Sequence, residues 1–190
     1  MFINEKILIR RMKQAYKGSG VMMGREDGWY HIRGGYWYAK IAVGFVPRSI
    51  LALMIEMSGA IPEEGECWTS DKEKDQYELY MTGIRIPKDR YPMDKRRVAL
   101  LSPGGKPLRV LQREDNEILT FDEELVAAAD PACLDKANDE GELKGPYYDE
   151  DGGCYWETKQ AVWRIIHERY PELDTIAEHL GKIPLEIDDL

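Results

Sequence analysis

The sequence predicts an α+β fold, in which an antiparallel sheet packs against a small number of helices. Short runs rich in β-branched and aromatic residues alternate with tight-turn dipeptides, of which Asp27-Gly28 and Gly34-Gly35 are the clearest. Two segments, 5–17 and 47–57, have the periodicity and the end signals of helices. With 190 residues, 43% of them hydrophobic, the chain can bury one sizeable core, or one core and a small satellite.

The first predicted element is an amphipathic helix that follows Asn4 and ends at Gly18. Its apolar side chains recur at the helical spacing, so that Leu8 and Met12 share one face. Three short strands separated by the two turn dipeptides are expected next, and they form an antiparallel meander. The expected strands are 21–26, 28–34 and 36–43.

The segment 47–57 is predicted to be a buried helix that lies across the sheet. Pro47 suits the first turn, Gly59 suits the residue just past the end, and the side chains between them are apolar nearly all round. Strands in "ECWTSDK" and "YELYMTGI" are then expected to pair as a hairpin. This order of helix, three strands, helix and two strands resembles, in topology, one repeat of a sliding DNA clamp.

A Pro-rich, basic segment, 87–97, is expected to be a linker or a long loop. It separates a first α+β unit, 1–86, from a second group of strands and helices, 98–190, unless the two form one continuous domain. In the second group, strands are expected in "VALLS", "LRVLQRE" and "EILTF", and a short helix is expected after Asp122.

The chain is predicted to end in helices. Val162, Ile165 and Ile166 share one face of an expected helix over 158–169. Pro171 ends that helix and can begin another one in "ELDTIAEHL".

Charge is distributed unevenly along the chain. Residues 1–60 carry nine Lys and Arg against four Asp and Glu, whereas residues 114–190 carry six against 22, in a chain whose net charge is −9. A basic front and an acidic back favour either internal neutralisation or the binding of a partner through one pole. An acidic surface that only aids solubility is the simpler alternative.

The stretch "YYDEDGGCYW", 147–156, has three interpretations. As a calcium loop it lacks a suitable first ligand, because Tyr147 stands there, and Glu157 is too close to complete an EF-hand. As a reactive-thiol site it is unfavourable, because the carboxylates around Cys154 raise the pKa of its thiol. A β-hairpin that turns at Asp151-Gly152 or Gly152-Gly153 is therefore favoured, with the aromatic pairs facing each other across the strands.

No motif for a catalytic, cofactor or metal site is found in the sequence. The chain contains no G-x-x-x-x-G-K-[ST], G-x-G-x-x-G or G-x-S-x-G, and its three cysteines include no C-x-x-C. We therefore expect a protein that is not an enzyme and uses no cofactor or metal, while an active site of scattered carboxylates stays an open alternative. The longest apolar run has six residues and no signal-peptide core is found, so we expect a cytoplasmic location without membrane contact.

In size, acidity, compact α+β build and lack of catalytic motifs, the chain resembles small accessory proteins of prophages and mobile elements of Gram-positive bacteria. The resemblance implies a binding function, often the inhibition of a host defence or nucleic-acid enzyme, as in anti-CRISPR proteins. We expect a non-enzymatic inhibitor whose acidic C-terminal third mimics phosphates and docks on the basic, nucleic-acid-binding surface of a protein partner. The expected partner-binding residues are Glu123, Glu124, Asp139, Glu140, Glu142, Asp149, Glu150 and Asp151.

The alternative function is that of a nucleic-acid-binding accessory factor. Four cations share one face of the first helix, and exposed aromatic side chains on the neighbouring strands would stack on the bases of a single strand. The net negative charge of the chain counts against direct binding of nucleic acid. The residues expected for this alternative are Lys6, Arg10, Lys13, Lys17, Trp29, Tyr36 and Trp37.

Overall fold

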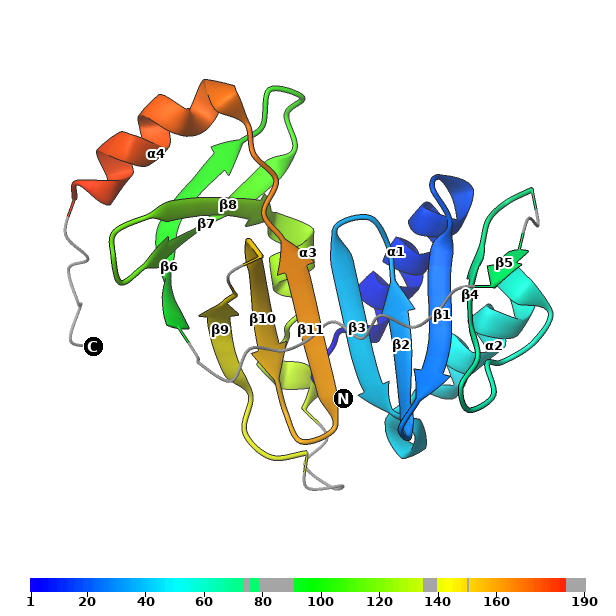
Figure 1. Ribbon diagram of the computed structural model, residues 1–190. Coiled ribbons are helices and arrows are strands. Elements are labelled where there is room, and N and C mark those ends of the chain that lie inside the picture. The colour runs from blue at the N-terminus through cyan, green and yellow to red at the C-terminus, as the bar shows by residue number, and fades with distance from the viewer. Residues whose placement is uncertain (74–75, 79–90, 135–139, 150, 184–190) are drawn as a thin grey trace.

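The computed structural model describes residues 1–73, 76–78, 91–134, 140–149 and 151–183, and shows an α+β protein that consists mostly of sheet (Figure 1). One eleven-stranded sheet has the strand order β5-β4-β1-β2-β3-β11-β10-β9-β6-β7-β8, and neighbouring strands are antiparallel. The strands are β1 (Val21–Glu26), β2 (Trp29–Arg33), β3 (Trp37–Ala42), β4 (Cys67–Ser70), β5 (Gln76–Glu78), β6 (Tyr91–Leu101), β7 (Pro107–Arg113), β8 (Ile118–Asp122), β9 (Lys144–Tyr148), β10 (Gly153–Glu157) and β11 (Ala161–Ile166). The helices are α1 (Glu5–Lys17), α2 (Arg48–Ser58), α3 (Glu123–Ala127) and α4 (Asp174–Gly181), with short 3-10 helices at Val43–Phe45, Pro131–Cys133 and Pro171–Leu173.

The first helix and the meander form as the sequence predicts. The Asn4 side chain caps α1 by accepting a hydrogen bond from the Ile7 N–H at 3.4 Å, and Gly18 follows the last turn. Between β1 and β2, Asp27 and Gly28 both have positive φ angles, of 52° and 76°. This is the geometry of a type I′ turn, whose twist matches that of the two strands it joins.

Helix α2 exists where it was expected, but it is not buried all round. Ile50, Leu53 and Met54 point into the core, whereas Ile55 is 48% exposed. Because only one face of α2 is turned to the core, the apolar side chain of Ile55 on the other side is exposed to water.

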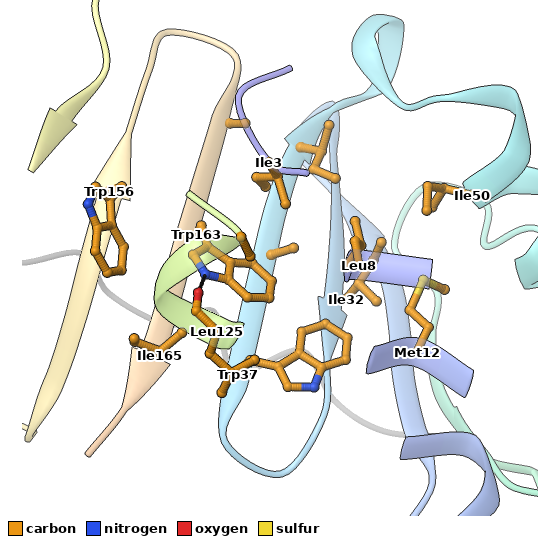
Figure 2. Packing of buried hydrophobic residues seen from close by; sticks show 14 of the residues in the cluster. Ile3, Leu8, Met12, Ile32, Trp37, Ile50, Leu125, Trp156, Trp163 and Ile165 are labelled. Carbon is orange, nitrogen blue, oxygen red and sulfur yellow. Dashed lines mark hydrogen bonds between the residues drawn. The ribbon is translucent and has the colours of Figure 1, made fainter. Parts of the chain in front are cut away.

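The hydrophobic core fills the space between one face of the sheet and the helices α1, α2 and α3 (Figure 2). Leu8 and Met12 enter it from α1. Trp163 of β11 stacks on Trp37 of β3 with 5.6 Å between ring centroids, and its Nε1 donates a hydrogen bond to the Leu125 carbonyl oxygen of α3 at 2.8 Å. The core therefore joins elements from both ends of the chain.

The segment 158–169, expected to be a helix, contains the strand β11 instead. This strand pairs with β10 on one side and with β3 on the other, so it lies in the middle of the sheet. Five of its six residues are buried, because side chains on both of its faces are covered. A strand of this kind lacks the polar–apolar alternation of a half-exposed strand, and the spacing of Val162, Ile165 and Ile166 then imitates a helix. The second C-terminal helix is confirmed as α4.

One sheet runs through both units that the sequence predicts. β3 pairs with β11, and Ile3 forms an antiparallel bridge with Ala129. Residues 91–97, expected to belong to a linker, form the first part of β6, while 87–90 lie outside the described residues. In the hairpin expected before them, β4 pairs antiparallel with β5, which overlaps the expected second strand, 77–84, at Tyr77 and Glu78, while 79–84 lie outside the described residues.

Candidate functional site

The stretch 147–156 is a β-hairpin, as the sequence predicts, made by β9 and β10. Tyr147 stands opposite Tyr155 as expected, but Tyr148 stands opposite Cys154 and not opposite Trp156, so only one of the two expected aromatic pairs forms. Burial, and to a lesser extent the nearby Asp149 carboxylate, raise the pKa of the Cys154 thiol well above its ordinary value. The thiol is therefore protonated at neutral pH and packs as a small apolar group.

Two of the eight carboxylates predicted to bind a partner are buried and stabilise the fold. Glu140 accepts hydrogen bonds from the Phe2 N–H at 2.8 Å and from the Thr158 hydroxyl at 3.1 Å. Asp149 receives two hydrogen bonds from Arg164, at 2.5 and 3.0 Å. Carboxylates held inside the protein cannot replace phosphates at an interface, so the role predicted for these two does not fit their position.

Two further carboxylates of the predicted set are paired with cations of the same chain. Glu123 accepts a hydrogen bond from Arg109 Nε at 2.6 Å. Glu124 of α3 forms ion pairs with Arg10 and Arg11 of α1, the latter at 2.5 Å, so the basic and acidic poles of the sequence meet within the molecule. Of the other four residues, Glu142 and Asp151 are exposed, and Asp139 and Glu150 lie outside the described residues.

The residues predicted for nucleic-acid binding are only partly brought together. Lys6, Lys13 and Lys17 are exposed on α1, on the same face as Arg10. Of the aromatic residues, Tyr36 is exposed, Trp29 is half-buried with the Lys40 ammonium 4.8 Å from its ring centroid, and Trp37 is buried in the core. Trp37 therefore cannot stack on bases, because its ring already stacks on Trp163.

A groove with a volume of about 850 Å³ lies between α4 and the turn that joins β7 to β8, and we call it the acidic groove. Apolar residues of its lining are Ile118, Leu119, Leu173 and Ala177. Its complete lining is Asp115, Asn116, Glu117, Ile118, Leu119, Thr120, Tyr148, Gly152, His167, Arg169, Tyr170, Leu173, Asp174, Ala177, Glu178, Gly181 and Lys182.

Carboxylates stand on both walls of the acidic groove. Asp115 and Glu117 belong to the β7–β8 turn, and Asp174 and Glu178 belong to α4. The side chains of Asp115, Glu117 and Asp174 are 55%, 51% and 46% exposed although each forms an ion pair, and Glu178 is exposed as well. Ion pairs this exposed contribute about 0–1 kcal/mol. The groove lining therefore holds four carboxylates against the two cations of Arg169 and Lys182, and its exposed ion pairs can be exchanged for pairs with another cation at little cost in free energy.

The segment between β11 and α4 holds that helix beside β8. His167 Nδ1 lies 2.9 Å from the Thr120 carbonyl oxygen, and Lys106 Nζ lies 2.8 Å from the Glu168 carboxylate. The Tyr170 hydroxyl donates a hydrogen bond to Glu168, which, together with burial, raises the pKa of Tyr170. These contacts fix the groove wall that α4 provides.

The far end of α4 approaches the β7–β8 turn so closely that a glycine is required. A Cβ atom at Gly181 would lie 2.7 Å from the Asn116 carbonyl oxygen, which is too close for any larger residue without a shift of the backbone. The two walls of the acidic groove therefore meet at Gly181 and Asn116.

The carboxylates of the acidic groove are not among the residues that the sequence predicts to bind a partner. Asp174 and Glu178 have the i, i+4 spacing that places two side chains on one helix face, and this signal was available in the sequence. Glu117 belongs to the expected strand "EILTF", and Asp115 lies between that strand and the expected strand "LRVLQRE". No sequence pattern indicates that the β7–β8 turn and α4 lie together, because they are far apart along the chain and meet only in the folded molecule.

A second, apolar cavity of about 410 Å³ lies near α3 and β9, with Leu111, Val126, Leu143 and Trp156 among its lining residues. Glu142 supplies a carboxylate to its lining. Among the residues that the structure describes, no group of three or more His, Cys, Asp or Glu side chains is placed to hold a metal ion. No helix in the described part of the chain is both long and apolar enough to cross a membrane.

Comparison with known proteins gives no family. No family model and no curated protein sequence matches the chain. The β subunit of DNA polymerase of Streptococcus pyogenes aligns with 91% of the chain at 11% identity and a TM-score of 0.37, and the chain spans 66% of that structure. A DNA polymerase III subunit beta DnaN sliding clamp from Bartonella birtlesii aligns with 96% of the chain at 8% identity and a TM-score of 0.27, over 67% of that structure. TM-scores this low do not show a common fold.

Proposed function

We propose that the protein is a non-enzymatic interaction protein that binds a basic surface of a protein partner through the acidic groove. The observation that supports this proposal is that partly exposed carboxylates from α4 and from the β7–β8 turn line one groove together with apolar side chains. The carboxylates attract cations, and burial of the apolar lining residues adds affinity that does not depend on charge.

The charge of the whole chain favours the same kind of partner. A net charge of −9 attracts basic surfaces over long distances and repels acidic ones. A protein that handles nucleic acid presents Lys and Arg side chains arranged to hold phosphates. The groove carboxylates would occupy the positions of those phosphates, and the proposed consequence for such a partner is inhibition.

The second candidate function is direct binding of nucleic acid by α1. The observation that favours it is that Lys6, Lys13 and Lys17 are exposed along one face of this helix. The pairing of Arg10 with Glu124 weakens this candidate, because one of the four cations is already neutralised. The burial of Trp37 removes one of its three stacking residues.

The two candidates are separated by affinity capture from a bacterial lysate, with and without nuclease. The groove variant carries Asp115→Lys, Glu117→Lys, Asp174→Lys and Glu178→Lys. The matched helix variant carries Lys6→Glu, Arg10→Glu, Lys13→Glu and Lys17→Glu. We expect a captured protein that survives nuclease, is lost with the groove variant and is retained with the helix variant.

The captured protein is then purified, and its association rate with the wild type is measured at increasing salt. The rate should fall between about 0.1 and 1 M salt, because the Debye length shrinks from about 10 to about 3 Å. Loss of capture by nuclease treatment and by the helix variant alone would reject the groove and support the second candidate.

A further inference from the structure

We propose that Arg113 occupies an arginine-binding position at the edge of the acidic groove, and that the partner segment bound there supplies an arginine that replaces it. The inference rests on the proposed function and specifies the chemistry of the partner. Arg113 then acts as a weak internal competitor, and the groove distinguishes arginine from lysine.

The position is built from three side chains around the Arg113 guanidinium. Arg113 Nη2 lies 2.9 Å from Asp115 Oδ2, and Arg113 Nη1 forms an ion pair with Glu117. The guanidinium carbon lies over the Tyr148 ring, 4.2 Å from its centroid. Asp115 and Glu117 come from the β7–β8 turn and Tyr148 comes from β9, so the fold itself brings an aromatic face beside two carboxylates.

This combination of groups suits a planar cation. A guanidinium can donate hydrogen bonds to carboxylates along its edge while its flat face lies on an aromatic ring. A lysine ammonium is compact and strongly hydrated, and it has no flat face to place on the Tyr148 ring while its hydrogens reach Asp115 and Glu117. The geometry therefore favours arginine over lysine.

The same three side chains also line the groove, which makes the position accessible to a second arginine. Asp115, Glu117 and Tyr148 all border the cavity, whereas the Arg113 side chain reaches them from β7 and is 27% exposed. Both of its carboxylate partners are half-exposed, so the pairs contribute little to stability.

When an arginine of the partner replaces Arg113, Asp115 and Glu117 each still pair with a guanidinium group. The Arg113 side chain can then point into water. An incoming arginine gains contacts that Arg113 does not have. The α4 side of the groove offers the exposed carboxylate of Glu178, and Leu173 of the lining can contact an apolar neighbour of the arginine in the partner sequence. An arginine flanked by apolar residues is therefore the expected occupant.

The test uses three short fluorescein-labelled peptides and fluorescence anisotropy. In the first peptide Arg alternates with Leu, in the second Lys replaces Arg, and in the third citrulline replaces Arg as a neutral isostere. We expect the wild-type protein to bind the Arg peptide roughly tenfold tighter than the Lys peptide, and the citrulline peptide more weakly than either. Tyr148→Leu should abolish the preference for Arg over Lys.

Two variants, Arg113→Ala and Arg113→Gln, test the competitor role directly. Each should bind the Arg peptide several-fold tighter than the wild type, because the position is vacated. Unchanged or weaker binding by both variants overturns the competitor role, with circular dichroism used to confirm that they are folded.

The outcomes also separate this inference from the proposed function. Equal binding of the Arg and Lys peptides, lost in Glu178→Lys and Asp174→Lys, overturns the arginine position and leaves the acidic groove as a docking site for cations. Failure of all three peptides to bind the wild type and the Arg113 variants overturns both.

Discussion

His31 and Tyr38 form a buried, neutral pair on neighbouring strands of the sheet. His31 Nδ1 lies 2.6 Å from the Tyr38 hydroxyl oxygen. Burial, and then the charge of Lys40, lower the pKa of His31 from 6.5 to about 4, and burial raises the pKa of Tyr38. At neutral pH neither side chain carries a charge, so the pair costs the fold no desolvation of an ion.

The lowered pKa of His31 makes stability depend on pH. Between about pH 6.5 and pH 4 the unfolded chain binds a proton at His31 that the folded chain does not bind, so this residue lowers the free energy of unfolding as the pH falls through that range. At higher pH the effect is absent. In the variant His31→Gln, this contribution to the decrease in the free energy of unfolding at acid pH should be absent.

The measurement is urea denaturation of the wild type and His31→Gln at pH 7.5 and pH 4.5. The variant is expected to be less stable at the higher pH, because the hydrogen bond to Tyr38 is altered. The difference in the free energy of unfolding between the wild type and His31→Gln should be smaller by about 1–2 kcal/mol at pH 4.5 than at pH 7.5, allowing for partial solvent screening. A difference that does not change with pH would contradict the neutral state of His31.

The Asp149–Arg164 pair gives a second test at the residue scale, with a control in the same turn. Asp149→Asn leaves the Arg164 guanidinium buried without its counter-ion, and about 3–5 kcal/mol of stability should be lost. Asp151→Asn, at an exposed position two residues away, should change stability by no more than about 0.5 kcal/mol. Similar denaturation midpoints for the two variants would show that Asp149 has no structural role.

At the scale of elements, two substitutions in α2 test whether the burial of an apolar residue sets the cost of replacing it by Asp. Leu53 is 4% exposed and Ile55 is 48% exposed, although both are apolar residues of one helix. Leu53→Asp places an unpaired carboxylate in the core and should cost about 4 kcal/mol or more, enough to unfold a marginally stable protein. Ile55→Asp should cost less than about 1 kcal/mol. Thermal melting followed by circular dichroism checks this, and equal effects would place Ile55 in the core.

β11, which the sequence predicts to be a helix, differs from the correctly predicted elements in the local signals that it carries. Helix α1, the meander and the β9–β10 hairpin each have local signals, namely a capping residue, a turn dipeptide or a change in periodicity. β11 has none, because both of its faces are buried and both of its edges are paired. The segment is a strand because it pairs with β3 and β10, and this pairing cannot be recognised from the residues of β11 alone.

At the scale of the whole molecule, the shared sheet predicts that the chain unfolds in one step. β3 from the first half pairs with β11 from the second, and the Arg11–Asp122 ion pair at 2.5 Å joins α1 to the end of β8. Far-UV circular dichroism and tryptophan fluorescence should therefore report the same urea midpoint. Two separate midpoints would show that the segments 1–86 and 98–190 are independent domains.

The same long-range contacts explain why the candidate site could not be read from the sequence. The excess of acidic residues after Arg113 is visible in composition, and it indicates an acidic pole. Tertiary contacts decide which of these carboxylates remain available to bind a partner. Asp149 is buried and paired with Arg164, and Glu124 is paired with cations of α1. The exposed carboxylates of the groove belong to other residues, in the β7–β8 turn and in α4.

The sequence by itself determined the α+β class, the helices α1, α2, α3 and α4, the meander and the β9–β10 hairpin, because each depends on side chains within a few residues of one another. It also determined the uneven charge. The tertiary structure alone decided that one sheet joins both halves, that 161–166 is a strand, and that α4 meets the β7–β8 turn to form the acidic groove. The physical reason is that strand pairing and groove formation depend on contacts between segments far apart in the chain, and local periodicity carries no record of them.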